Sequence, residues 1–199
     1  MFSTKYLIAA LALAFLPIDA IIAAESIHSQ CHRWAQGGGK LGPSSRPVLA
    51  KMIPAEKEKR LYRRLTPTQP GKEVAGGRPS TCSVNGYDTN KNRGVCLWNG
   101  VDQLQDPNKP GLPEDTYPGW LNGGNKQNCG RKVYINAPLR NTTYVPVLDG
   151  CMFDDKLAEE DGCSTIWLTK ILYRELGGDE ERGSMYIDNW DFDKEKGSN

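Results

Sequence analysis

Short alternating runs of apolar and polar residues dominate the second half of the chain. Residues 131–137 (RKVYINA) alternate, residues 138–141 (PLRN) have the composition of a turn, and residues 142–149 (TTYVPVLD) alternate again. Because the side chains of a strand point alternately to its two faces, this pattern predicts a β-hairpin. Pro146 lacks a backbone N–H, which places the second strand at a sheet edge or beside a bulge.

Further short elements surround this hairpin. Residues 163–176 carry leucines at helical spacing, and Gly177 follows them, so a helix is expected there. Three more runs have the apolar and aromatic content of short strands: residues 82–90, 95–100 and 184–192. The predicted fold class is therefore mainly β, with several short strands and one or two short helices.

The first 24 residues have a different character from the rest. Lys5 precedes an apolar run that is too short for a comfortable membrane span, and small residues follow at Ala20 and Ala24. This layout is typical of a secretory signal peptide. We expect cleavage after Ala24, or as second choice after Ala20. The mature protein is then secreted and extracellular, with no membrane association.

Residues 25–81 are expected to form a basic, largely disordered segment. Gly, Pro, Ser and Lys dominate residues 35–80, and aromatic residues are nearly absent. Such a segment cannot bury enough apolar surface to offset the entropy lost on ordering. Dibasic pairs end at Arg60 and Arg64. They are either part of a solvated charged helix or processing sites for a protease of the secretory pathway.

Charge is unevenly distributed although the whole chain carries only +1. Residues 31–80 hold 11 Lys or Arg and 3 Asp or Glu, whereas residues 81–199 hold 13 Lys or Arg and 19 Asp or Glu. An acidic domain repels phosphate backbones, so no nucleic-acid partner is expected.

Every cysteine follows the expected signal peptide. An even number in an oxidising compartment predicts disulfides, whose pairing the spacing alone does not fix. Without a CxxC pair, no metal site and no cofactor are expected. Asn141 opens an Asn-Thr-Thr glycosylation acceptor at the predicted hairpin turn. The six cysteines are Cys31, Cys82, Cys96, Cys129, Cys151 and Cys163.

Three motifs in order resemble the double-psi β-barrel superfamily. They are Asn128-Cys129-Gly130, then Asp149-Gly150-Cys151, then Cys163 leading to Trp167-Leu168-Thr169. That superfamily includes barwin-like and RlpA-like proteins, first domains of expansins, plant natriuretic-peptide-like proteins, kiwellins and small fungal endoglucanases. The resemblance covers residues 82–193 and implies a small six-stranded double-psi β-barrel stapled by disulfides, with a disordered tail at 194–199. It also favours a bridge between Cys129 and Cys151.

Catalysis in the endoglucanase branch needs two carboxylates, one on each side of the sugar. Asp88, which follows Tyr87, matches the first place, but Trp167 stands at the second. An indole cannot transfer the required proton, so the resemblance implies that the protein is not an enzyme. Asp149 is then either a structural hydrogen-bond acceptor at a strand end or part of the lip of a shallow groove.

Three functions are consistent with these features. The first is a secreted non-catalytic binding protein. In this interpretation it is a fungal-type effector that acts on an extracellular protein of a host or neighbouring organism. The second is a polysaccharide-binding or wall-loosening, expansin-like protein that uses aromatic side chains as a sugar platform. The third, which the resemblance suggests, is a cysteine-protease inhibitor. The partner is expected to be an extracellular protein or polysaccharide, and the protein a monomer. The candidate groove residues are Tyr87, Asp88, Trp98, Trp120, Asp149 and Trp167.

Overall fold

The protein's structure is a computed structural model that describes residues 29–39, 41, 47–54, 80–100, 116–153 and 157–194. The helices within these residues are α1 (Gln30–Gln36), α4 (Glu159–Ser164) and α5 (Lys170–Glu175). The strands are β1 (Val48–Met52), β2 (Val95–Trp98), β3 (Lys132–Asn136), β4 (Thr143–Cys151), β5 (Ile166–Leu168), β6 (Ser184–Ile187) and β7 (Asn189–Phe192).

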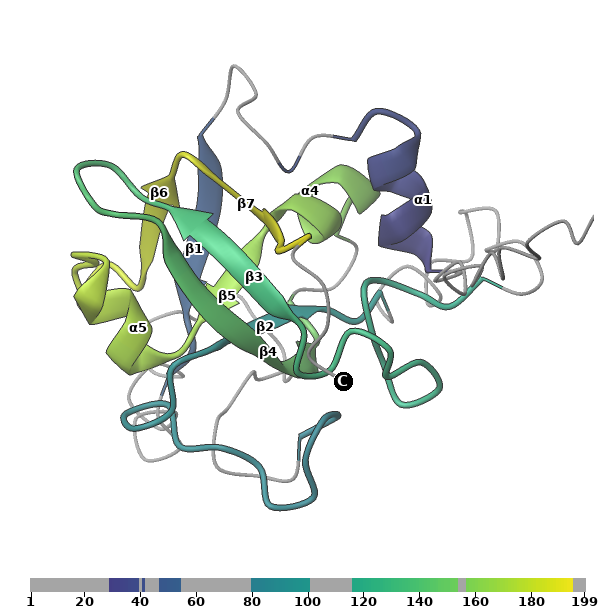
Figure 1. Cartoon of the computed structure of the whole chain (residues 1–199), viewed down its shortest axis with the longest axis horizontal. Coiled ribbons are helices and arrows are strands. Elements are labelled where there is room, and N and C mark those ends of the chain that lie inside the picture. Colours follow the sequence, from purple (N-terminus) through teal and green to yellow (C-terminus); the bar gives the residue numbers. More distant parts are fainter. Residues whose placement is uncertain are drawn as a thin grey trace, which may run out of the picture.

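A single curved sheet forms the body of the described domain, in the strand order β6-β1-β5-β2-β4-β3-β7. β1 runs parallel to β5 and β2 runs parallel to β4, whereas the other neighbours are antiparallel. Only Asp188 separates β6 from β7, yet β6 pairs with β1 and β7 pairs with β3. One bent stretch of chain thus supplies both end strands of the order, and the sheet curls around its core (Figure 1).

The mainly β fold with short helices and disulfides is confirmed. The sheet contains seven strands rather than six, and the strand expected over residues 184–192 is divided at Asp188 into β6 and β7. The crossed connections that define a double-psi barrel remain a prediction.

Buried tryptophans link α4 to the sheet. The ring of Trp120 meets that of Trp190 edge-on, with centroids 5.8 Å apart and an interplanar angle of 68°. Trp120 Nε1 donates to the carbonyl of Cys163 at 2.9 Å, and Trp190 Nε1 donates to the carbonyl of Ser164 at 2.7 Å. Carbonyls in the last turn of a helix lack partners within the helix. The core therefore satisfies the end of α4 and fixes its position.

Part of the segment expected to be a disordered linker lies inside the sheet. β1 occupies the position between β6 and β5, and its first, third and fifth residues are buried. Leu49 and Lys51, which alternate with them, are half-buried on the outer side. The domain boundary expected at residue 82 is corrected here: the folded domain already includes β1. The five-residue alternation is hidden by the Gly- and Pro-rich composition around it.

Two other sequence expectations are also corrected. The helix expected over residues 163–176 is interrupted by β5, where Ile166 and Leu168 are buried by pairing with β1 and β2. The leucine spacing in this stretch thus reports burial rather than one continuous helix. Residues 82–90, expected to be a strand, form turns.

Pro146 lies in an interior strand rather than at an edge, since β4 pairs with both β2 and β3. The register against β2 shifts between Val95 and Cys96, whose partners are Val147 and Asp149. Leu148 is therefore left over as a bulge, two residues after the proline. Of the two alternatives considered from the sequence, the structure supports the bulge.

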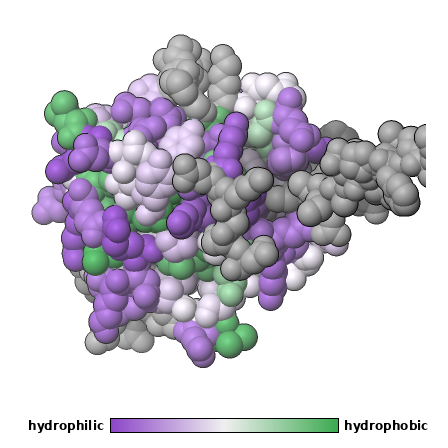
Figure 2. All heavy atoms as spheres, in the orientation of Figure 1, coloured by the Kyte–Doolittle hydropathy of each residue, from purple (hydrophilic) through white to green (hydrophobic). Residues whose placement is uncertain are grey.

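Several sequence expectations fall outside the described residues. They are the signal peptide at 1–24 and the dibasic sites at Arg60 and Arg64, together with most of the tail at 194–199. Among the described residues, each helix is too short or too polar to traverse a lipid bilayer. In the view of Figure 2, hydrophilic residues cover most of the visible face, and apolar residues are exposed only in small separate areas.

Candidate functional site

The carboxylate of Asp149, near the end of β4, accepts hydrogen bonds from the backbone. Its Oδ1 accepts the backbone N–H of Thr81 at 2.7 Å and that of Gly150 at 2.9 Å. Burial raises the pKa of Asp149, and the hydrogen bonds from Thr81 and Gly150 oppose this rise only in part. The carboxylate therefore fastens the turn around residue 81 to β4.

Tyr87 lies against this carboxylate. The side chain is buried, and its hydroxyl has no hydrogen bond of good geometry among the described residues. Burial and the charge of Asp149 both raise the pKa of Tyr87 far above its ordinary value. Tyr87 consequently stays protonated at any physiological pH, and it is part of the support of Asp149 rather than an exposed sugar-binding surface.

Asp88 occupies a different environment from Asp149. It is half-exposed beside a turn, where Oδ1 accepts the N–H of Asn90 at 2.9 Å and Oδ2 lies 3.4 Å from Nζ of Lys91. The Asn90 hydrogen bond and then Lys91 lower the pKa of Asp88. In the described part of the chain, no hydrogen bond joins Asp88 to Asp149.

The two tryptophans proposed as a sugar platform belong to the core. Trp98 is fully buried, and Trp120 is 2% exposed. The ring of Trp98 packs against Gly162 of α4 so closely that a Cβ at that position would collide with it. Neither ring can stack on a ligand. The sequence interpretation was wrong here because Gly-rich loops on both sides made a buried strand resemble an exposed one.

Among the four aromatic groove candidates, Trp167 is the one that remains partly accessible. It stacks on Phe153 with ring centroids 5.6 Å apart and an interplanar angle of 28°, and Lys51 Nζ lies 5.5 Å from its ring centroid. Its indole N–H is buried without a hydrogen-bond partner among the described residues. Trp167 thus packs on the outer side of β5, where Lys51 and Phe153 connect it to a neighbouring cleft.

The six cysteines form three disulfides, but the pairing favoured by the resemblance is wrong. Cys129 pairs with Cys82, and Cys151 pairs with Cys96. The third bridge joins Cys31 to Cys163. The physical reason is the strand order: β2 is the parallel neighbour of β4, and the register places Cys96 beside Asp149 and Trp98 beside Cys151. Three disulfides are typical of proteins outside the reducing cytosol.

One group of side chains has the elements of a metal site, namely Cys96, Asp149 and Cys151, whose ligand atoms lie within 4.8 Å of one another. The two sulfurs are already bonded to each other. A cysteine binds a metal ion as a free thiolate, so Cys96 and Cys151 cannot serve as ligands as long as their disulfide is formed.

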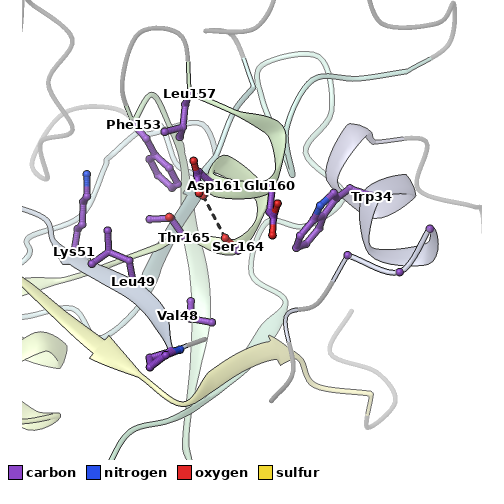
Figure 3. A pocket seen from close by; sticks show the side chains of 14 residues that line it. Trp34, Val48, Leu49, Lys51, Phe153, Leu157, Glu160, Asp161, Ser164 and Thr165 are labelled. Atoms are coloured by element: carbon purple, nitrogen blue, oxygen red, sulfur yellow. Dashed lines mark hydrogen bonds between the residues drawn. The ribbon is translucent and has the colours of Figure 1, made fainter. Parts of the chain in front are cut away.

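A large cleft lies beside these residues and was not expected from the sequence. It has a volume of about 1070 Å³ and lies between α1, β1 and the start of α4 (Figure 3). The side chains around it come from segments that are distant in sequence. They are Trp34, Val48, Leu49, Lys51, Phe153, Leu157, Glu160, Asp161, Ser164 and Thr165. No local sequence motif predicts such a site, because its residues come from three elements that meet only in the folded protein.

The walls of the cleft differ in chemistry. Glu160 and Asp161, in the first turn of α4, are exposed, and neither side chain has an ion-pair partner in the described ranges. Lys51 stands on the β1 side. Trp34 contributes a half-buried aromatic ring from α1. The cleft thus has an acidic wall with an aromatic neighbour on one side and the cation of Lys51 on the other.

The glycosylation acceptor is accessible. Asn141 is exposed in the turn between β3 and β4, and the side chain of the next residue, Thr142, donates to Asn136 Oδ1 at 2.7 Å. The turn geometry therefore leaves the Asn141 side chain open to solvent.

Comparison with known proteins identifies no family. No family model matches the sequence, and no curated protein gives a significant match. Among solved structures, the Streptomyces papain inhibitor superposes with a TM-score of 0.40 and 16% sequence identity, over 76% of this chain and 97% of the inhibitor. A likeness at this level establishes neither a shared family nor a shared activity, and the function has to be argued from the residues.

Proposed function

We propose that the protein is a secreted, non-catalytic binding protein whose ligand occupies the cleft between α1, β1 and α4. The observation that carries the proposal is the contrast between the cleft and Asp149. The oxygen Oδ1 of Asp149 is already committed to the N–H groups of Thr81 and Gly150. The cleft, in comparison, exposes the carboxylates of Glu160 and Asp161, which have no ion-pair partner among the described residues, and the half-buried ring of Trp34.

Extracellular function is supported by the three disulfides. The bridges also suit recognition, because a stapled fold loses little conformational entropy when it binds. The volume of the cleft lies at the upper end of the range found for binding sites of small ligands. Acting as an effector on another organism's extracellular protein is one way in which such a protein would be used.

Polysaccharide binding is the second candidate, and one observation favours it. The cleft contains the half-buried aromatic ring of Trp34 together with the half-buried hydroxyl group of Ser164, a combination that can stack on and hydrogen-bond to sugars. The aromatics first considered for this role, Trp98 and Trp120, are buried and do not support it.

The test of a non-catalytic role is turnover. Purified protein is incubated with cellulose, xylan and mannan, and the release of reducing sugar is followed over time. We expect none from the wild type, from Asp88→Asn or from Asp149→Asn. Sustained turnover by the wild type that either substitution abolishes, with the circular dichroism spectrum unchanged, would overturn the proposed function. Inhibition of papain, assayed in parallel, would assign the protein to the inhibitor class instead.

A further inference from the structure

We propose that the cleft binds an extended peptide segment through a lysine or arginine side chain, which enters between the ring of Trp34 and the carboxylates of Glu160 and Asp161. This inference rests on the proposed binding function and deepens it by naming the class of partner. It concerns side chains whose combined chemistry no single sequence motif carries.

The first step is the placement of the Trp34 ring. Trp34 lies in α1, and the Gly39 N–H donates to the Trp34 carbonyl at 2.9 Å as the chain leaves the helix. The indole packs so closely on Gly39 that a Cβ at that position would overlap the ring. The ring is therefore held against the backbone on one side. In Figure 3 it stands beside Glu160, with the open space of the cleft in front of both.

The second step is the charge of this corner. Glu160 and Asp161 lie in the first turn of α4, next to Glu159. Carboxylates in that position interact favourably with the helix dipole, so the clustering of negative charge there is stabilised. The side chains of Glu160 and Asp161 nevertheless remain exposed. An aromatic face beside a carboxylate attracts a cation both through the ring quadrupole and through charge. A lysine or arginine side chain satisfies both groups at once.

The third step is the opposite wall, which selects a peptide over other ligands. Lys51 projects from β1 and already lies over the ring of Trp167. The cleft is therefore acidic at the α1–α4 end and basic at the β1 end. A peptide with one basic side chain offers a cation to the first end and backbone carbonyls to the second. A neutral oligosaccharide does not use this polarity, and a nucleic acid is repelled at the acidic end.

Phe153 and Leu157 complete the site. Both side chains lie at the rim between the two ends, as Figure 3 shows. Leu157, which is half-buried, provides an apolar surface for the residue that follows the basic one in the ligand, whereas Phe153 is 3% exposed and contributes little contact area. The expected recognition element is accordingly a basic residue adjacent to an apolar residue in an extended chain.

The probe is a synthetic hexapeptide, Gly-Leu-Arg-Lys-Leu-Gly with blocked termini, titrated into the full-length protein labelled with ¹⁵N. The matched control peptide carries citrulline and norleucine in place of arginine and lysine, which keeps the shape and removes the charge. We expect saturable shifts of amide signals from Trp34, Lys51 and α4 with the basic peptide, and affinity at least about fivefold weaker with the control peptide.

Variants then test the assigned side chains. Glu160→Gln should weaken binding of the basic peptide about five- to tenfold, and Trp34→Ala should do the same. Glu175→Gln is the matched control, since it also removes one exposed carboxylate from a helix but on α5, away from the cleft. It should leave the affinity unchanged. Raising the ionic strength should weaken binding of the wild type more than that of Glu160→Gln.

Three results would overturn the inference. One is equal binding of the charged and uncharged peptides, and another is unchanged affinity in Glu160→Gln with the fold intact. The third is a response of the cleft signals to cellohexaose but not to the peptide. That last result would leave the proposed binding function standing and assign a sugar ligand, whereas polysaccharide turnover would remove the proposed function itself.

Discussion

Cys31 and Cys163 are joined by a disulfide across 132 positions of sequence, with Cα atoms 5.2 Å apart. The bond connects α1 to α4, which are the two helices that carry Trp34 and Glu160. The aromatic ring and the carboxylate of the proposed site are thus held in one arrangement by a covalent link between their helices.

Removing this link should weaken the fold more than removing a shorter one. The pair Cys31→Ser and Cys163→Ser opens a loop with a sequence separation of 132, compared with 47 for Cys82→Ser and Cys129→Ser. In the loop-entropy description the longer loop costs about 1 kcal/mol more, out of a total of roughly 4–5 kcal/mol. Urea unfolding of the two double variants measures the difference. An equal or reversed order would show that native contacts, not chain entropy, determine the effect.

Cleavage in the basic segment should not release the N-terminal part. We expect a protease specific for dibasic pairs to cut after Arg60 or Arg64 in native protein. The piece containing β1 should remain attached through Cys31–Cys163 and through pairing with β5 and β6. Gel electrophoresis with and without reductant detects the outcome. Loss of the piece without reductant would contradict the pairing, and resistance to the protease would contradict an accessible basic segment.

Asp149→Ala should destabilise the protein by about 1–3 kcal/mol, because the N–H groups of Thr81 and Gly150 lose their acceptor. Asp149→Asn is the matched variant, since its amide oxygen can still accept both hydrogen bonds. We expect a smaller loss for asparagine than for alanine in denaturant unfolding at pH 7. The same loss in both variants would mean that the negative charge, rather than the acceptor, is what the fold requires.

The raised pKa of Asp149 predicts how stability depends on pH. A folded-state pKa above the unfolded value of about 3.9 means that the native state holds the proton more tightly. The contribution of this group is therefore fully present below about pH 4 and is lost as pH rises through the folded pKa. The difference in unfolding free energy between wild type and Asp149→Asn should shift against the wild type from pH 4 to 7. A constant difference over that interval would exclude the raised pKa.

Gly162→Ala should destabilise the protein although alanine favours helices. The new Cβ collides with the ring of Trp98, which is fully buried and cannot move aside. A loss of about 1–3 kcal/mol is expected, against a gain of up to about 1 kcal/mol from helix propensity. Gly123→Ala, where no atom lies within 4 Å, is the control and should change stability by less than about 0.5 kcal/mol. A stabilised Gly162→Ala would disprove the close packing of α4 on β2.

Local pattern was enough to predict some elements of this fold. The hairpin of β3 and β4 follows from strict alternation around a short turn, since both strands are neighbours in sequence and in space. β1 could not be found in the same way. Its partners β5 and β6 lie far along the chain, and its five residues are surrounded by a composition typical of disorder.

The site was harder to predict than the fold for a related reason. Sequence reasoning gave Asp149 two alternative roles, a structural acceptor at a strand end or part of a groove, and its hydrogen bonds agree with the first. Trp98 was misjudged because all four positions of β2 are buried, and a strand covered on both faces has no alternation to reveal its environment. Trp34 and Glu160 meet only through folding, so neither could be assigned a role from its neighbours in sequence.

The position of β1 also has a consequence for how the protein is made. A nascent chain emerges in order, so β1 appears early, whereas β5 and β6, between which it lies, are translated near the end. β1 therefore stays unpaired, with its apolar residues exposed, until almost the whole polypeptide has left the ribosome. Contacts between such distant segments form slowly. A truncated translation product that ends before β5 would therefore contain the hairpin of β3 and β4 but neither partner strand of β1. Cellular quality control would recognise it as incompletely folded.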